Sequence, residues 1–140
     1  MHNLLSTQAR LHRMGSAQSP KCKSQGCNEV GTLEHELIYC SKNDGVGHRL
    51  LLCLDHHIPQ VQAQAILRLD HGDISDELSL PITLLTAITL SYIWKERASG
   101  SNIRAYKIRA ELEQYIALLR TTRFESTVIK LADMINLMFQ

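Results

Sequence analysis

The clearest regularity in the chain is the spacing of its hydrophobic residues after Pro81. Between residues 103 and about 119, and again between about 125 and 138, apolar side chains recur every three or four positions, as on one face of an α-helix. A third apolar run, from Pro81 to about residue 97, predicts a buried helix that begins at the proline. Three such helices with short links pack most simply as an antiparallel bundle.

The start of the chain carries a weaker pattern. A short helix is predicted over residues 6–14, with Ser6 or Thr7 as its cap and Gly15 as its end. Residues 15–31 are polar and rich in Ser, Gly, Asn and Lys. This segment has turn chemistry and almost nothing from which to build a core.

Between this polar segment and the bundle, the pattern predicts further helix. Residues 32–42 form an apolar stripe behind Thr32, which is a suitable cap. Residues 48–54 are a short apolar run that fits either a strand or a helix, and we favour a helix because Gly47 precedes it and Pro59 follows. Residues 70–77 are predicted to be a polar connector.

Composition narrows the class of protein. Hydrophobic residues make up 44% of the 140 and charged residues 21%, which is close to the average of globular domains. The least charged stretch, residues 78–94, is interrupted by Ser and Thr, so it predicts a core helix and no membrane partner. Arg10 and Arg13 stand where a signal peptide needs its apolar run. We therefore expect an intracellular protein, nuclear or cytoplasmic and not secreted, in which clustered Cys and His indicate metal rather than disulfides.

Such a cluster is present, because Cys22, Cys27, His35 and Cys40 form the pattern C-x4-C-x7-H-x4-C. Two thiolates on a tight loop and two ligands from the helix after it suit a structural zinc site. Four protein ligands leave no position for a water molecule, so hydrolytic zinc chemistry is not expected. His35 and Cys40 are five residues apart, about 140° around an ideal helix, so Cys40 is expected at a frayed last turn.

Zn²⁺ bound there would supply the stability that the polar segment lacks. The sequence thus predicts a mostly α fold, with a small zinc-stapled knot followed by an antiparallel helical bundle. We place the zinc-binding module at residues 1–45 and the helical body at residues 46–140. Of the other candidate ligands, Cys53 lies among leucines and is expected to be a buried apolar side chain. The histidines at 48, 56 and 57 are the alternative ligands.

Charge is distributed unevenly although the net charge is only +1. Arg10, Arg13, Lys21 and Lys23 lie in the first 28 residues, which contain no acid. A basic segment beside a metal site could meet phosphates, whereas a uniform attraction to polyanions is excluded by the near-neutral total. A solvated helix face remains the alternative reading of the two arginines.

The same segment resembles the zinc-binding region that follows the polymerase in reverse transcriptases of non-LTR retrotransposons. The resemblance covers about residues 4–40 and consists of R-L-x-R-x-G, S-P-x-C, a second Cys, and T-x-E-H-x-L-x-x-C. The matching positions are Arg10, Leu11, Arg13, Gly15, Ser19, Pro20, Cys22, Cys27, Thr32, Glu34, His35, Leu37 and Cys40. One departure is that the first pair is usually C-x2-C and here is C-x4-C, which enlarges the loop.

The resemblance implies a module that helps to hold template RNA or target DNA, with Arg10, Arg13, Lys21 and Lys23 at phosphates. The paired aspartates of a polymerase are absent from the sequence. The chain would therefore be a non-catalytic piece, working with a polymerase domain in a longer parent protein or left over from one.

Two other functions remain open. Residues 50–59, LLLCLDHHIP, are similar to the strand and DHH element of DHH phosphoesterases, in which Asp55, His56 and His57 would help bind manganese. The alternative to a manganese site is that these three residues form an ordinary helix end before Pro59. A zinc-stapled protein-interaction module, with residues 81–140 docking on a partner, is the third class. The aromatic residues Tyr92, Trp94 and Tyr106 are expected in the core of the bundle.

Overall fold

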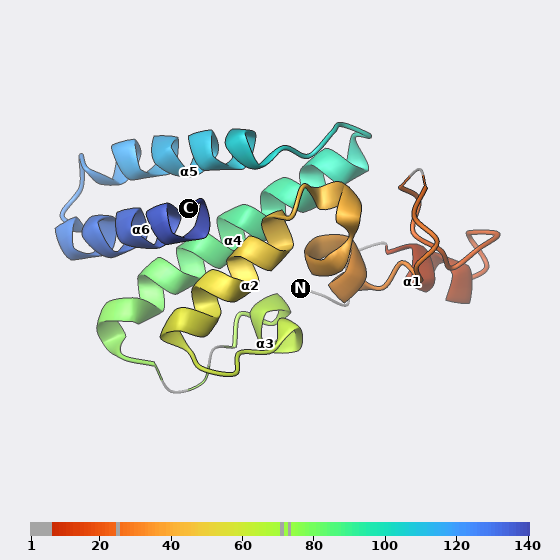
Figure 1. The fold of residues 1–140 in the computed structure, drawn as a ribbon, viewed down its shortest axis with the longest axis horizontal. Coiled ribbons are helices and arrows are strands. Elements are labelled where there is room, and N and C mark those ends of the chain that lie inside the picture. Colours follow the sequence, from red (N-terminus) through yellow and green to blue (C-terminus); the bar gives the residue numbers. More distant parts are fainter. Residues whose placement is uncertain (1–6, 25, 71, 73) are drawn as a thin grey trace.

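The computed structural model describes residues 7–24, 26–70, 72 and 74–140. Within these residues the protein is mostly helical (65%), and its β interactions amount to one isolated antiparallel bridge between Lys21 and Val30. The helices are α1 (Gln8–Arg13), α2 (Val46–His57), α3 (Ala63–Leu67), α4 (Asp76–Ala98), α5 (Ala105–Leu119) and α6 (Glu125–Met138), with a π-helix η2 (His35–Tyr39) and a 3₁₀-helix η3 (Ser41–Asn43) (Figure 1). The predicted mostly α fold is confirmed.

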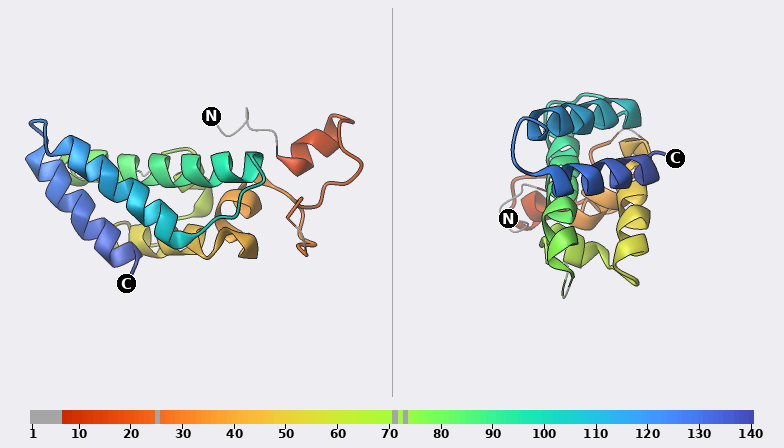
Figure 2. Two further views of the ribbon diagram at one scale, coloured as in Figure 1. Left: turned by 90° about the horizontal axis from the view of Figure 1, so that it is seen from above. Right: turned by 90° about the vertical axis from the view of Figure 1, so that its left-hand side faces the viewer.

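α4 is the central helix of the body. It packs against α2, α5 and α6, and α5 and α6 lie beside each other as an antiparallel pair (Figure 1). Fully buried aliphatic side chains from all four helices form the core, among them Leu50, Leu54, Ile82, Leu85, Ile93, Ile108, Leu112 and Leu131. The segment before η2 projects from one end of this body (Figure 2). A knot followed by a helical bundle is therefore the observed arrangement.

The knot and the body share apolar contacts. Leu37 and Ile38 of η2 are buried in the same core as the helices. Gly47, at the start of α2, lies so close to η2 that a Cβ at this position would be 2.2 Å from the carbonyl oxygen of Ile38. Only a glycine leaves room for this approach of two backbones. The division of the chain at residue 45 stays a prediction.

The structure corrects several details. α4 begins at Asp76 rather than at Pro81. The carboxylates of Asp76 and Glu77 favour the positive N-terminal end of the helix. Pro81 lies close enough to this end that it removes only one intrahelical hydrogen bond. α3 was not predicted, since its five residues are too few to show a period. Tyr106 is 69% exposed and outside the core, whereas Tyr92 is buried and Trp94 half-buried.

The predicted helix over residues 32–42 begins as expected, because helix starts at Leu33 and the Thr32 hydroxyl accepts a hydrogen bond of 3.2 Å from the His35 amide. Its later part differs, since the helical turn passes into η2 and Cys40 then adopts an extended conformation before η3. In α1 the cap is Thr7, whose side chain accepts a hydrogen bond from the Arg10 amide, while Ser6 lies outside the described residues. Gly15, with φ of +77°, follows the end of that helix. α2 confirms the helix favoured for residues 48–54.

By length and composition, α4 is the one helix in the described part of the chain that could cross a membrane. In the structure Ile82, Leu85, Leu90 and Ile93 of α4 lie in the core formed with α2, α5 and α6. Of the apolar stretch of α4, 39% is buried inside the protein.

Asp44 offers a test of how the knot is joined to α5. Its carboxylate accepts a hydrogen bond of 2.8 Å from the Ala105 amide, and Arg104, the N-cap residue of α5, provides no side-chain cap. Replacing Asp44 by Ala should therefore lower the free energy of unfolding by about 1 kcal/mol, as for other lost helix caps. Asp44→Asn keeps an acceptor and tolerates the left-handed backbone, so it should cost less in the same urea titration. Equal losses in the two variants would contradict this role.

Candidate metal centre

The first two ligands lie on a short hairpin. The Cys22 amide donates to the Glu29 carbonyl (2.8 Å), and the Gly31 amide donates to the Pro20 carbonyl (2.7 Å). At the turn, the Cys27 amide donates to the Ser24 carbonyl (3.0 Å). These hydrogen bonds hold the backbone of the polar segment in place, which its few apolar side chains could not do. They also bring the thiols of Cys22 and Cys27 close together.

The other two ligands are brought together by the π-helix. The Cys40 amide donates to the His35 carbonyl at 2.7 Å, which closes a ring from residue i to residue i+5. Residues five apart are thereby placed one turn apart, whereas in an α-helix they would be separated by about 140°. The wide turn replaces the frayed α-helical end that the sequence suggested. Single π-turns of this kind are frequent at functional sites.

The four side chains converge on one point. All of their ligand atoms lie within 4.8 Å of one another. The Sγ atoms of Cys22 and Cys40 are 3.8 Å apart, and the Sγ atom of Cys27 is 3.2 Å from Nε2 of His35. In a tetrahedral zinc site, two sulfurs lie about 3.8 Å apart and a sulfur and a nitrogen about 3.6 Å apart, from bonds of about 2.3 and 2.0 Å. The cluster therefore fits a tetrahedral metal ion with little movement.

The electrostatics of the cluster favour thiolate at one position. Burial alone would raise the pKa of the Cys22 thiol, but hydrogen bonds with Ser24 and Arg97 outweigh it and lower the pKa below its ordinary value. The pKa of Cys27 is raised, first by desolvation and then by the adjacent sulfurs of Cys22 and Cys40. Burial lowers the pKa of His35, which favours the neutral imidazole. A divalent cation would relieve the repulsion between the sulfurs, and it binds Cys as the thiolate and His as the neutral imidazole.

Arg97, near the end of α4, contacts the cluster from the helical body. Its guanidinium donates to Sγ of Cys22 (2.9 Å) and to Oδ1 of Asn43 (3.0 Å). Asn43 is itself fully buried and donates to the Glu36 carbonyl at 2.7 Å. Three thiolates, one neutral imidazole and a divalent cation carry a net charge of −1, which one guanidinium balances. Sequence spacing gave no sign of this contact, since Arg97 and Cys22 are 75 residues apart.

Replacing Arg97 by Met should weaken metal binding by about 10- to 100-fold, the usual loss when a residue that orients a ligand is removed. Competition with a chelating dye measures this change directly. Arg123→Met removes the same charge from an exposed position in the loop before α6 and should leave the affinity unchanged. Equal affinities for the Arg97 and Arg123 variants would show that the guanidinium does not support the metal.

The alternative metal ligands do not converge. In the described part of the chain, Cys22, Cys27, His35 and Cys40 are the one group of three or more His, Cys, Asp or Glu side chains whose ligand atoms meet. Asp55 accepts a hydrogen bond from the Gln60 amide (2.9 Å), as expected of a helix end, and the rings of His56 and His57 meet edge to face. His48 is exposed and contacts the ring of Tyr39.

Cys53 lies away from the cluster, on α2. It is buried, its Sγ donates to the Met134 carbonyl, and burial raises the pKa of its thiol to about 11. These properties agree with the predicted role of a small apolar side chain.

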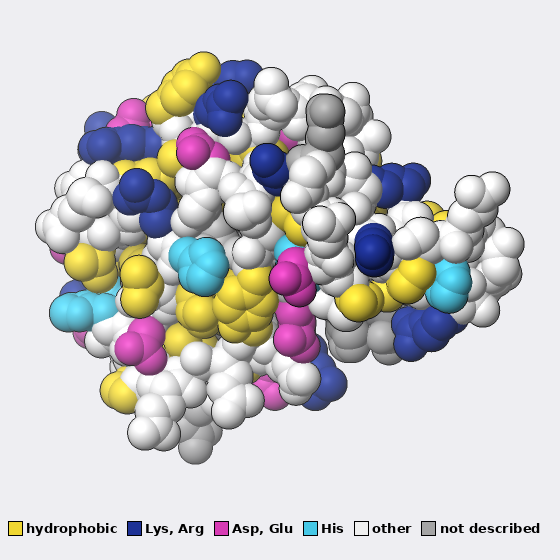
Figure 3. Space-filling view, turned by 45° about the vertical axis from the view of Figure 1, so that its right-hand side comes forward, with side chains coloured by type: hydrophobic (Ala, Val, Ile, Leu, Met, Phe, Trp, Pro, Cys, Tyr) yellow, Lys and Arg dark blue, Asp and Glu magenta, His cyan; other side chains and the backbone are white. Residues whose placement is uncertain are grey.

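The four basic residues near the N-terminus are spread over two elements. Arg10 and Arg13 belong to α1, whereas Lys21 and Lys23 belong to the hairpin. Arg13, Lys21 and Lys23 are exposed, and Arg10 is half-buried. Figure 3 shows Lys and Arg side chains on and beside the segment that projects from the helical body. They are mixed with polar side chains rather than gathered into one dense patch. Their contact with phosphates stays a prediction.

Comparisons of the chain with models of known families, with curated proteins and with solved structures find no match. The resemblance of residues 4–40 to the zinc-binding segment of retrotransposon reverse transcriptases therefore remains a hypothesis. The structure itself shows a helical protein in which the ligand atoms of three cysteines and one histidine lie close enough together to hold a metal ion.

Proposed function

We propose that this chain is a non-catalytic module in which a structural zinc ion fastens the hairpin to η2, and that the module binds RNA or DNA. The observation that carries the proposal is the convergence of Cys22, Cys27, His35 and Cys40 within 4.8 Å. A donor set of three thiolates and one imidazole is typical of structural zinc. Because the protein supplies all four ligands, the ion would stabilise the fold and would not activate a water molecule.

The nucleic-acid part of the proposal rests on two supports. Arg13 on α1 and Lys21 and Lys23 on the hairpin are exposed, so they can approach a phosphate backbone. The sequence resemblance to a segment that helps to hold template RNA or target DNA points to the same partner. In a longer parent protein, a polymerase domain would then provide the catalysis.

The first test is metal content. Protein purified under reducing conditions without a chelator should contain about one zinc per chain, measured by mass spectrometry of the metal. Another divalent metal in equal amount would change the identity of the ion but keep the site. Protein that holds no metal after zinc is supplied would refute the structural centre.

The second test is the salt dependence of nucleic-acid binding. With about four phosphate contacts, the slope of log K against log salt should lie at about −2.8 to −3.6, from about 0.7–0.9 per contact. Replacing Arg13 and Lys21 by Ala should bring the slope closer to zero by about 1.4 to 1.8. Lys107 and Arg123, exposed on and after α5, form the matched control pair, and their replacement should change the slope little. A parent protein that binds no nucleic acid at low salt would favour the protein-interaction module.

A further inference from the structure

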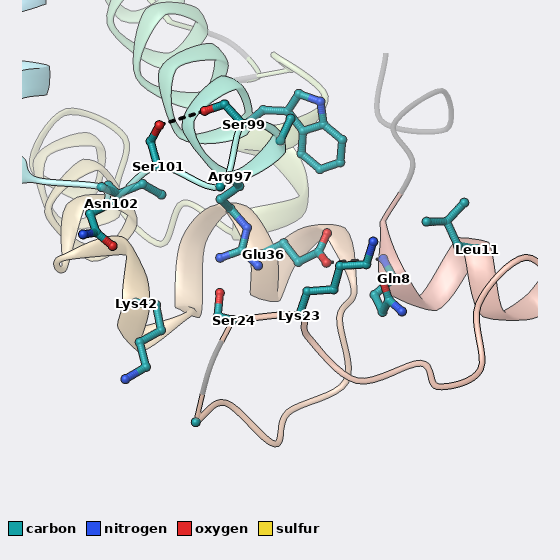
Figure 4. A pocket seen from close by; sticks show the side chains of 15 residues that line it. Gln8, Leu11, Lys23, Ser24, Glu36, Lys42, Arg97, Ser99, Ser101 and Asn102 are labelled. Atoms are coloured by element: carbon teal, nitrogen blue, oxygen red, sulfur yellow. Dashed lines mark hydrogen bonds between the residues drawn. The ribbon is translucent and has the colours of Figure 1, made fainter.

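A groove lies between the knot and the end of α4 (Figure 4). Its volume is about 1130 Å³, larger than the about 300–1,000 Å³ of a typical small-molecule pocket. One wall is formed by α1, the hairpin and η2, and the other by the last turns of α4 and the loop after it. A groove of this size suits a segment of an extended chain better than a small metabolite.

The groove is predominantly cationic. Lys23, Lys42 and Arg97 line it, against one acidic side chain, Glu36. The Glu36 carboxylate is buried and accepts a hydrogen bond from the Gln8 amide (3.3 Å). In the described part of the chain the only ion pair is between Arg109 and Glu113, on α5, so neither lysine is paired with a carboxylate there. Arg97 balances the metal centre, and Arg97 and Lys23 both act electrostatically on the Glu36 carboxylate. The two lysines, at exposed positions, are therefore the groups that an anionic ligand can approach.

The three cations are spread along the groove rather than focused on one point. In Figure 4, Lys23 and Lys42 extend on opposite sides of Arg97, and Lys23 reaches toward Gln8. Arg97 is fixed between them by its bonds to Cys22 and Asn43. Separated charges of this kind match the successive phosphates of a strand, whereas a single phosphate would need them to converge.

The wall formed by α4 and the loop after it also offers groups that suit bases. Trp94, which is half-buried, lines the groove from α4. Beyond it, Ser99, Ser101 and Asn102 present hydroxyl and amide groups, and the two serine hydroxyls hydrogen-bond to each other at 3.0 Å. An aromatic side chain beside a cationic track is the usual means by which proteins bind unpaired nucleotides.

We propose that this groove binds a single strand of RNA or DNA, with successive phosphates at Lys23 and Lys42 and a base stacked against Trp94. The inference rests on the proposed function and narrows it to unpaired nucleic acid. Bases in a duplex are stacked on one another and cannot reach a tryptophan in the wall of a groove. The groove also adjoins the metal centre, because Arg97 contacts both.

Trp94 is the only tryptophan in the chain, so its fluorescence reports directly on the groove. Titration with a 12-nucleotide oligo(dT) or oligo(U) at low salt should quench this fluorescence. The same length of duplex should bind at least tenfold more weakly and leave the emission unchanged. A single nucleoside monophosphate should bind far more weakly than the oligonucleotide, since it meets only part of the track.

Two variants separate the contacts. Lys42→Ala, at an exposed position, should reduce the salt slope for the oligonucleotide by about 0.7, and Lys107→Ala on α5 should not change it. Trp94→Leu keeps an apolar side chain but removes the aromatic face, so it should weaken binding about tenfold, measured by the anisotropy of a labelled oligonucleotide. Because Trp94 also packs against the core, Lys42→Ala provides the test that does not depend on this packing.

The outcomes distinguish the inference from the function on which it rests. The proposed role of the groove would be contradicted if a duplex bound as tightly as a single strand, with no effect of Lys42→Ala and no change in Trp94 fluorescence. Nucleic-acid binding itself would then still stand. Equal affinity for a mononucleotide and an oligonucleotide would indicate that the groove binds a small phosphorylated ligand, and it would contradict the proposal of a bound single strand. Binding of no nucleic acid at all would remove both proposals.

Discussion

Removal of the metal by a chelator should release residues 21–43 from their ordered state while the helices α4, α5 and α6 keep most of their circular-dichroism signal. The hairpin has little apolar burial of its own, and Val30 is 50% exposed. Structural zinc in comparable small sites contributes about 10–16 kcal/mol of apparent binding free energy, which becomes folding free energy. Loss of the ion should therefore be the largest single perturbation of this protein.

The helical body has a separate source of stability. Its core holds several fully buried aliphatic side chains from α4, α5 and α6, and each contributes about 1.5–3 kcal/mol by burial. Hydrogen exchange measured along the chain should thus rise sharply in residues 21–43 after chelation, with a much smaller change in α5 and α6. The thermal transition should also move to lower temperature.

A matched pair of cysteine variants removes the need for a chelator. Cys40→Ser deletes a proposed ligand, so it should lose bound metal and reproduce the exchange pattern of the chelated protein. Cys53→Ala removes a buried cysteine that lies outside the cluster, and it should retain one metal ion per chain. Identical exchange before and after chelation of metal-loaded protein would contradict a structural role for the ion.

Gly47→Ala should be the most damaging single substitution outside the metal centre. A Cβ at this position would lie 2.2 Å from the Ile38 carbonyl oxygen and 2.4 Å from the Ile38 Cα. Both are backbone atoms of η2, which cannot rotate away as a flexible side chain could. Since the two elements would have to separate, we expect a loss of at least about 3 kcal/mol, comparable with severe overpacking of a core.

Helix propensity predicts the opposite sign for this substitution, which makes the measurement decisive. Alanine in place of glycine within a helix is ordinarily stabilising by about 1 kcal/mol. Gly45→Ala is the control, because a Cβ there meets nothing within 4 Å and the cost is limited to its left-handed backbone, about 1–2 kcal/mol. Urea denaturation of the three proteins should rank them parent, Gly45→Ala, Gly47→Ala. A Gly47→Ala protein as stable as the parent would show that α2 and η2 do not approach this closely.

The parts of the fold predicted from sequence are those fixed by local pattern. The helix predicted from about 125 to 138 coincides with α6. A strongly periodic apolar face can be recognised from a single sequence without any knowledge of distant contacts. The proximity of the four proposed ligands is likewise confirmed, since they all lie within a stretch that needs only a hairpin and one turn to bring them together. The identity of the metal and its occupancy stay predictions.

The parts that were missed depend on contacts between distant residues. Arg97 reaches Cys22 across 75 positions, and Asp44 reaches the Ala105 amide across 61. No period or motif in the sequence encodes either contact. The exposure of Tyr106 is a similar case, because a helical spacing among aliphatic residues does not say which neighbours will cover it.

The position of Arg97 also has a consequence for the order in which the protein is assembled during synthesis. Cys22 and Cys40 are 18 residues apart, whereas Cys22 and Arg97 are 75 apart. Closing the shorter loop costs about 1 kcal/mol less chain entropy. The ligands also leave the ribosome before α4 has been made, since chains emerge from their N-terminal end. We therefore expect the nascent chain to capture its ion first, and Arg97 to close over a site that is already loaded.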